Sequence, residues 1–376
     1  MRAPSGRTNA LRRLTTITFF GLFPLSTLVA MLLVSRSDDS IAADFHHEIY
    51  PQAELMLGGG DPYPRPDFDP TAAANFIWPP LDAYLLAPLT VLPSGAADVV
   101  MVLFGLGCFA LALWVLEVRD WRVYGVFALW PEVVGEMRVS HLTPQLCLCL
   151  ALAWRYRGTR FVPGLLVGLS ISLKFFVWPV VAWLLATRRF REALVAVGFA
   201  GASLLLLIPY GLVDYLRALL QLGEAFDQDS YSLFGLLTQG GFSDGVARGA
   251  TWTIGCALLV TAFRYRSFTL AVATALALSP IAWLDYFALA GIPLAVTRPR
   301  LSWIWFVPLA TWGLEGAGLG IGDTPGTLRL MLAFGIVVAV AFADEMRQRR
   351  GQLDPRLDDR SLRAHPRAGG SRLGTP

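Results

Sequence analysis

A short polar run that follows the first long apolar segment carries side chains suited to proton transfer. It reads Asp44-Phe45-His46-His47-Glu48, and in a helix Asp44, His47 and Glu48 share one face. A carboxylate held there is suited to take a proton from a hydroxyl group, as a general base does. The alternative is an ordinary solvated acidic loop, because further Asp and Glu residues follow in the same segment.

Lys174 is the single lysine of the chain and lies in the middle of the apolar segment 161–186. An ammonium group among apolar residues needs an anionic partner, and a phosphate supplies one. The alternative is a side chain whose charged end reaches water. Since arginine serves at all other non-histidine basic positions, the lone lysine favours a functional role.

Two further motifs place polar residues beside apolar segments. Asp285 follows Ser279-Pro280-Ile281-Ala282-Trp283 inside an apolar stretch, where an acid faces a cavity or pairs with an arginine or a backbone group. Gly58-Gly59-Gly60-Asp61-Pro62-Tyr63 is in part plain turn punctuation, and Tyr63 is also typical of an interfacial aromatic.

The composition indicates which elements must position these residues. Hydrophobic residues make up 55% of the chain, charged residues only 16%, and the mean hydropathy is +0.53. Soluble domains carry roughly a quarter charged residues, so the deficit fits a lipid-facing surface. The net charge of +3 gives no nucleic-acid footprint. The four cysteines lie in apolar stretches and are interpreted as packing residues.

The hydropathy pattern predicts an all-α fold, a polytopic transmembrane helical bundle with about nine to eleven spans. Leu14–Val34 is long enough to be the first span. Arginines in the tail 1–13 place that tail in the cytoplasm, and the arginine-poor loop 35–76 is then extracytoplasmic. The membrane domain is expected over 14–346, with a disordered cytoplasmic tail over 347–376.

Two finer features are also expected from local signals. Pro51 to Leu57, followed by Gly58-Gly59-Gly60, predicts a short helix along the membrane surface. Segment 161–186 has arginines on both flanks, which favours a segment that enters the membrane and returns.

The order of these motifs resembles the integral-membrane GT-C glycosyltransferases, and most closely glycosyltransferase family 87. That family includes mannosyltransferases that use polyprenyl-phosphate-mannose. The matching motifs run through most of the chain: Asp-Phe after the first span, Gly-Asp-Pro-Tyr, Trp-Pro-Pro-Leu with a later Ala-Pro-Leu, Gly…Leu-Lys with Arg188-Arg189 after it, and Ser-Pro-Ile-Ala-Trp. The chain departs from the family at Thr143-Pro144-Gln145, where Gly-Gln is usual, and at Asp285-Tyr286, where histidines are frequent.

By this resemblance, Asp44 corresponds to the catalytic base and Lys174 to a lysine near the lipid-phosphate donor. The implied reaction is an inverting transfer of a hexose, with mannose as the default, from a polyprenyl-phosphate sugar to an envelope glycolipid or glycan acceptor. The chemistry takes place on the outer side of the cell membrane, without cofactor, metal or nucleic acid. The substrate-binding residues expected on this basis are Glu48, Asp61, Tyr63, Gln145, Lys174, Trp283 and Asp285.

Two alternatives stay open at this point. In the first alternative, the donor sugar is arabinofuranose on a similar lipid carrier. In the second, the chain is a non-enzymatic lipid or sugar transporter, which favours inverted repeats and charged residues at the bilayer midplane. The sequence shows no convincing internal repeat.

Overall fold

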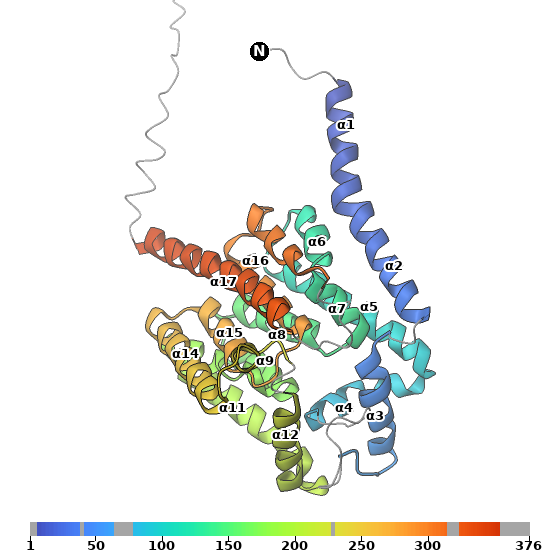
Figure 1. The fold of residues 1–376 in the computed structure, drawn as a ribbon, viewed down its shortest axis with the longest axis vertical. Helices are drawn as coiled ribbons and strands as arrows, with labels where there is room; N and C mark the ends of the chain where they lie inside the picture. The colour runs from blue at the N-terminus through green and yellow to red at the C-terminus, as the bar shows by residue number, and fades with distance from the viewer. Residues whose placement is uncertain (1–5, 38–40, 64–77, 227–229, 314–322, 354–376) are drawn as a thin grey trace, which may run out of the picture.

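The computed structural model describes residues 6–37, 41–63, 78–226, 230–313 and 323–353. Within these ranges every regular element is helical, which confirms the expected all-α class (Figure 1). The α-helices are α1 (Gly6–Ile17), α2 (Phe23–Ser37), α3 (Tyr50–Leu57), α4 (Pro80–Leu86), α5 (Ser94–Val115), α6 (Trp121–Ala128), α7 (Pro131–Val139), α8 (Thr143–Arg155), α9 (Val162–Leu173), α10 (Val180–Ala186), α11 (Phe190–Leu204), α12 (Leu212–Phe226), α13 (Leu233–Gln239), α14 (Asp244–Tyr265), α15 (Phe268–Ala277), α16 (Gly291–Thr297) and α17 (Thr324–Leu353). Short π- and 3₁₀-helices join them: η1 (Thr18–Leu22), η2 (Phe45–Ile49), η3 (Ala87–Val91), η4 (Phe175–Val177), η5 (Leu205–Tyr210), η6 (Leu284–Ala290) and η7 (Trp303–Thr311).

Five helical stretches of the described chain are long and apolar enough to cross a bilayer. They are Ala10–Arg36, Ser94–Val115, Phe190–Tyr210, Asp244–Tyr265 and Thr324–Arg350. Shorter apolar helices cover Val162–Leu173, Phe175–Ala186, Phe268–Ala277 and Leu284–Thr297. The protein is therefore an integral membrane protein with a polytopic helical bundle. Several of the apolar segments counted in the sequence are short or broken helices.

The ends of the expected membrane domain fall inside helices. The span expected at Leu14–Val34 is part of one long helical stretch, α1–η1–α2, which stands at one side of the molecule (Figure 1). The boundary expected at 346 lies within α17, which continues to Leu353. The rest of the tail, 354–376, and part of the expected outer loop, 64–77, lie outside the described residues.

The short helix after the first span is present as α3. Pro51 lies in its first turn, where a missing backbone N–H costs nothing, and Gly58 is its C-terminal cap. Gly59 follows with a φ of +79°, a conformation that favours glycine. Gly58 and Gly60 both donate backbone hydrogen bonds to the last turn of the helix, so the glycine run ends α3.

Segment 161–186 enters the bundle and returns, as the arginines on both flanks suggest. Helix α9 packs against α11: Gly164 lies directly against the backbone of Glu192, and Gly168 against that of Ala196. The two contacts advance together along both chains, so α9 and α11 run in the same direction. Because α10 ends at Ala186, just before α11 begins, both ends of the segment lie at the same end of α11.

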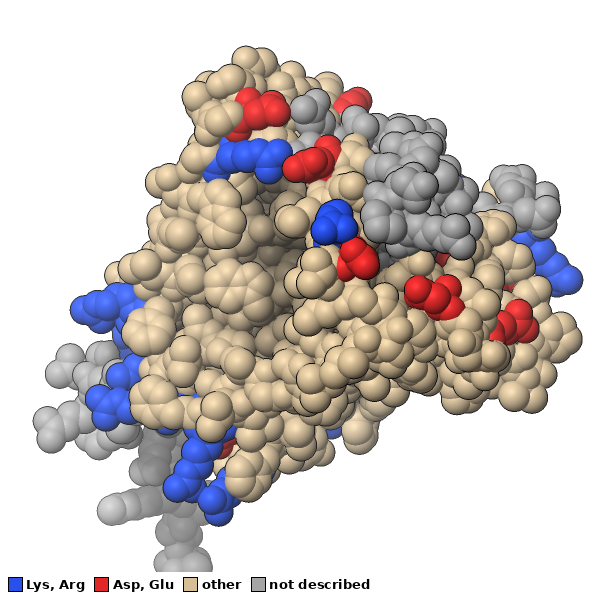
Figure 2. Space-filling model, turned by 90° about the horizontal axis from the view of Figure 1, so that it is seen from below, with Lys and Arg blue, Asp and Glu red and all other residues tan. Residues whose placement is uncertain are grey.

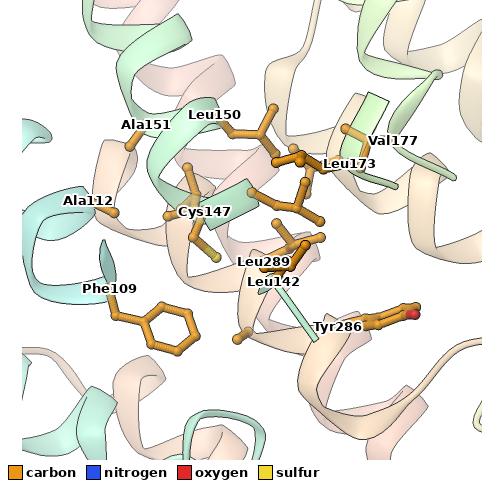
Figure 3. Close-up of a cluster of buried hydrophobic side chains, with 14 of the residues drawn as sticks. Phe109, Ala112, Leu142, Cys147, Leu150, Ala151, Leu173, Val177, Tyr286 and Leu289 are labelled. Atoms are coloured by element: carbon orange, nitrogen blue, oxygen red, sulfur yellow. The ribbon is translucent and has the colours of Figure 1, made fainter. Parts of the chain in front are cut away.

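The hydrophobic core surrounds α8, which packs against α5, α9 and η6. Leu142, Leu173, Val177 and Leu289 meet in this cluster, and Tyr286 lies at its edge (Figure 3). Three cysteines, Cys108, Cys147 and Cys149, are buried there or nearby, in keeping with the expected packing role. Cys256 differs, because it is exposed on the span helix α14.

Candidate functional site

The polar residues of the candidate site come from chain segments that are far apart in the sequence. Each residue lies where a helix begins, ends or breaks. Asp44 precedes η2, Trp78 precedes α4, His141 lies between α7 and α8, and Lys174 separates α9 from η4. Their side chains meet inside the bundle. Asp285 and Tyr286 join them from η6.

His141 connects two of the carboxylates. Its Nε2 atom contacts Oδ2 of Asp44, and its Nδ1 atom lies 3.1 Å from Oδ1 of Asp285. Thr143 donates a hydrogen bond of 2.7 Å from its hydroxyl group to the other oxygen of Asp285. Both ring nitrogens therefore face carboxylate oxygens, an arrangement that suits an imidazolium with two N–H donors.

The carboxylates also set the protonation of this ring. His141 lies outside the five span helices, and its side chain is buried. Burial alone lowers the pKa of the imidazole, but Asp44 and Asp285 outweigh it and raise the pKa to about 10. At neutral pH the ring is therefore a cation between two carboxylates.

Lys174 is the second cation of the site and is 8% exposed. Its ammonium nitrogen lies 3.6 Å from the centre of the Trp78 ring and donates a hydrogen bond of 2.8 Å to the hydroxyl of Tyr286. Tryptophan is the strongest cation–π partner among the side chains. An ammonium has three N–H donors, so the bond to Tyr286 leaves capacity for an anion.

Trp78 links this cation to the first loop. Its indole N–H donates a hydrogen bond of 2.7 Å to Glu48, and its backbone carbonyl accepts one of 3.2 Å from the Tyr63 hydroxyl. Burial, followed by the neighbouring charge of Asp44, raises the pKa of Glu48 to about 7. Glu48 is therefore a carboxyl group that changes charge near neutral pH.

Two more carboxylates are buried behind these residues. In the described ranges, both carboxylate oxygens of Asp82 lack a hydrogen-bond partner. One carboxylate oxygen of Glu136, Oε2, lacks a partner there as well. Glu136 lines a small cavity with Ser140 and Gln145, and the Gln145 side-chain amide is likewise unpartnered in that part of the chain. Buried polar groups of this kind normally bind water or a neighbouring group.

The structure brings most of the residues singled out in the sequence into one connected group. Asp44, Glu48, Lys174 and Asp285 lie in it, Tyr63 joins through Trp78, and the Trp283 ring lies beside His141. Three residues stand apart. Gln145 faces the small cavity, Asp61 is exposed and accepts a hydrogen bond from the backbone of Tyr63, and His47 is exposed on η2.

Four members of the group are not among the residues expected from the sequence: Trp78, Glu136, His141 and Tyr286. Trp78 has the pattern of an interfacial aromatic, and Tyr286 only follows a candidate acid. His141 has no partner near it in the sequence, since Asp44 and Asp285 are 97 and 144 positions away. The only local signal is a polar residue next to the Thr-Pro start of α8.

Among the described residues, no group of three or more His, Cys, Asp and Glu side chains has the arrangement of a metal site. On the face at the α12 end of the molecule the surface is hollowed near its middle, with basic and acidic side chains beside the hollow (Figure 2). The site residues themselves offer carboxylates that accept protons and two cations, His141 and Lys174, held by hydrogen bonds. This arrangement is suited to acid–base chemistry on a substrate with an anionic group.

One comparison with known proteins gives a match. The family model described as Glycosyltransferase family 87 matches residues 76–284, more than half of the chain. The matched range includes Trp78, His141 and Lys174 and ends one residue before Asp285, while Asp44 and Glu48 precede it. Neither the curated proteins nor the solved structures contain a significant match.

Proposed function

Because this chain belongs to glycosyltransferase family 87, we propose that it transfers mannose from a polyprenyl-phosphate carrier to a hydroxyl group of an envelope glycolipid or glycan. Membership of the family makes the chain a glycosyltransferase and sets aside the transporter alternative. Its span helices suit a substrate that is itself a lipid.

The observation that carries the proposal is the convergence of Asp44 and Lys174. Asp44 contacts His141, and Lys174 contacts Trp78 and Tyr286, whose rings lie beside His141. A transfer from a sugar phosphate needs both a base for the incoming hydroxyl and a cation for the departing phosphate. These two residues supply the pair.

In the proposed step, an oxygen of Asp44 takes the proton of the acceptor hydroxyl. The acceptor oxygen forms a bond to the anomeric carbon from the face opposite the phosphate. The bond between the anomeric carbon and the phosphate oxygen breaks, and its electron pair leaves with the phosphate. The products are the glycosylated acceptor, with inverted configuration at the anomeric carbon, and polyprenyl phosphate.

Lys174 stabilises the charge that develops on the leaving phosphate. It is buried, so its attraction for an anion is less screened than on a surface. Trp78 and Tyr286 hold the ammonium on two sides without neutralising it. Of the other expected substrate contacts, Glu48, Tyr63, Trp283 and Asp285 belong to the connected group, and Asp61 and Gln145 are proposed to bind substrate outside it.

The test compares membranes that carry the wild type or the Asp44→Asn variant, supplied with radiolabelled polyprenyl-phosphate-mannose. Loss of a general base lowers the rate of transfer by about 10²–10⁴-fold, so the initial rate of label incorporation into lipid and glycan is expected to fall at least a hundredfold. Asp214→Asn is the matched control, since Asp214 pairs with Arg217 on the exposed side of α12.

Two results would contradict the proposal. Full activity of Asp44→Asn removes this carboxylate from the mechanism. Transfer by the wild type from polyprenyl-phosphate-arabinofuranose, with none from the mannose donor, replaces the proposed sugar.

A further inference from the structure

We propose that His141 is a positioning residue, which holds the Asp44 carboxylate in one orientation for its role as the base. The inference rests on the role proposed for Asp44 and goes beyond it, because it assigns a task to a residue that does not touch the sugar. Three independent features of the structure support it.

The first feature is that the imidazole is bonded at both ends. Nε2 faces Asp44 and Nδ1 faces Asp285, so rotation of the ring by a half-turn would break both contacts. Asp285 is in turn fixed by the Thr143 hydroxyl, and its side chain is almost fully buried. A base fixed through two shells of hydrogen bonds spends less time in unproductive orientations.

The second feature is an aromatic enclosure around the ring. The centre of the imidazole lies 5.4 Å from the Trp78 ring, 6.0 Å from the Tyr286 ring and 6.5 Å from the Trp283 ring, which is nearly parallel to it. These rings leave the two nitrogens directed at carboxylates and exclude water from the faces. In such surroundings a charged hydrogen bond is stronger than in water.

The third feature is the backbone on either side of His141. Ser140 has a φ of +58° and Leu142 a φ of +67°, both in the left-handed region that non-glycine residues rarely adopt. Ser140 ends α7 and Leu142 precedes α8, so the chain leaves one helix and enters the next with His141 alone between two strained residues. Strain of this kind concentrates at functional sites, where the surrounding structure maintains it.

The charged groups around the ring single out His141 as the cation next to Asp44. The charged and titratable side chains that interact with the imidazole or with its two carboxylate partners are Asp44, Glu48, Glu136, Lys174, Asp285 and Tyr286. Most are acids, and of the two cations His141 is the one in contact with Asp44, whereas Lys174 donates a hydrogen bond to Tyr286. The imidazole is therefore the cation placed to fix the orientation of the Asp44 carboxylate.

The first arm of the test measures the contact between His141 and Asp44 without any substrate. Dicyclohexylcarbodiimide reacts with protonated carboxyl groups, and mass spectrometry of the purified full chain gives the rate of modification at Asp44 at pH 6. We expect the rate to rise at least fivefold in His141→Gln, whose amide keeps the approximate shape of the ring but cannot carry charge. His46→Gln is the matched control, because His46 contacts Asp98 at 2.8 Å in a pair that is separate from this group.

The second arm measures transfer kinetics with the polyprenyl-phosphate-mannose donor. We expect His141→Gln to lower kcat at least tenfold while KM for the donor changes less than twofold, and the acid limb of the pH profile to move to higher pH. His46→Gln is expected to match the wild type in all three quantities. A residue with a merely structural role would lower the amount of folded protein and leave the pH profile in place.

The two arms separate the failure of this inference from that of the proposed function. Equal modification of Asp44 in the wild type and His141→Gln overturns the inference, whatever the activity. Faster modification with unchanged kcat and pH profile in an active enzyme also overturns it. Faster modification in a protein whose wild type does not use the mannose donor upholds the contact between His141 and Asp44 and rejects the proposed donor.

Discussion

At the scale of single residues, Glu48 differs from the other acids of the first loop. Its carboxylate accepts a hydrogen bond from the indole N–H of Trp78, and the residue is half-buried. Its pKa of about 7, against an ordinary value of 4.5, means that the folded chain holds a proton that the unfolded chain releases. The folded state is therefore favoured at acidic pH by this one group.

The expected consequence is a pH-dependent stability. The contribution of Glu48 is fully present below about pH 4.5 and is lost as the pH rises through about 7. We expect the apparent Tm of the wild type in detergent to fall across this range by more than that of Glu48→Gln, whose amide oxygen still accepts the Trp78 bond. Thermal unfolding followed by tryptophan fluorescence at several pH values gives both curves. Parallel curves would show that Glu48 titrates alike in the folded and unfolded chains.

Residues could be predicted from the sequence where a charge interrupts an apolar pattern. Lys174 and Asp285 stand out in this way, and Asp44 does because it follows a span directly. His141 could not be found so, because a single histidine in a short polar turn has no distinguishing pattern. The role proposed for it comes from contacts with residues 97 and 144 positions away, which only the packed helices establish.

At the scale of elements, the hairpin formed by α9, η4 and α10 decides where Lys174 lies. Lys174 adopts an extended conformation, with φ −148° and ψ +110°, and so ends α9. Helix α9 reaches the site because it packs closely on α11, and glycines make that contact possible. Small residues that let helix backbones approach are typical of packing within membranes.

We therefore expect Gly164→Ala to destabilise the protein. The added Cβ would overlap the backbone of Glu192 in α11, and no side chain there is free to move aside. Overpacking of this kind costs about 1–3 kcal/mol, which would lower the apparent Tm in a fluorescence-detected size-exclusion assay. Gly198→Ala on α11 is the control, because a Cβ there meets nothing within 4 Å. Equal Tm values for the two variants would argue against the close α9–α11 contact.

The helix signals in the sequence predicted some elements well. The glycines after α3 gave its C-terminal end, whereas its N-terminal end continues directly from η2. The arginines on both flanks indicated the return of segment 161–186. Helix ends that depend on tertiary contacts could not be predicted from the sequence. The polar end of α17 remains helical because Glu345 accepts hydrogen bonds from the start of α15, while Arg349 binds the backbone at the end of α14.

At the scale of the whole molecule, the basic residues near the α9–α10 hairpin lie at its two ends. Arginines cluster at the open end, where α8 ends and where α10 meets α11, and Lys174 lies at the turn. Basic residues mark cytoplasmic loops. The proposed orientation therefore puts the arginine end in the cytoplasm and the loop with Asp44 on the outer side.

Cysteine labelling tests this orientation. In a Cys256→Ser background the three remaining cysteines are buried. A cysteine in place of the exposed His47 is expected to react with a membrane-impermeant maleimide on intact spheroplasts. A cysteine in place of Arg160, exposed in the turn after α8, is expected to react only after permeabilisation. The reverse pattern would place Asp44 in the cytoplasm, away from the proposed lipid-linked donor.

The return of segment 161–186 also separates the position of a residue inside the bundle from the path of the chain that follows. When an ordinary span gains or loses residues, the chain after it is shifted or tilted. Here both ends of the segment lie at one end of α11, so lengthening or shortening both arms by one turn would shift the lysine along the hairpin by roughly 5 Å and leave the path of the following chain as it is. The fold thus permits the position of Lys174 to be adjusted while the rest of the chain keeps its path.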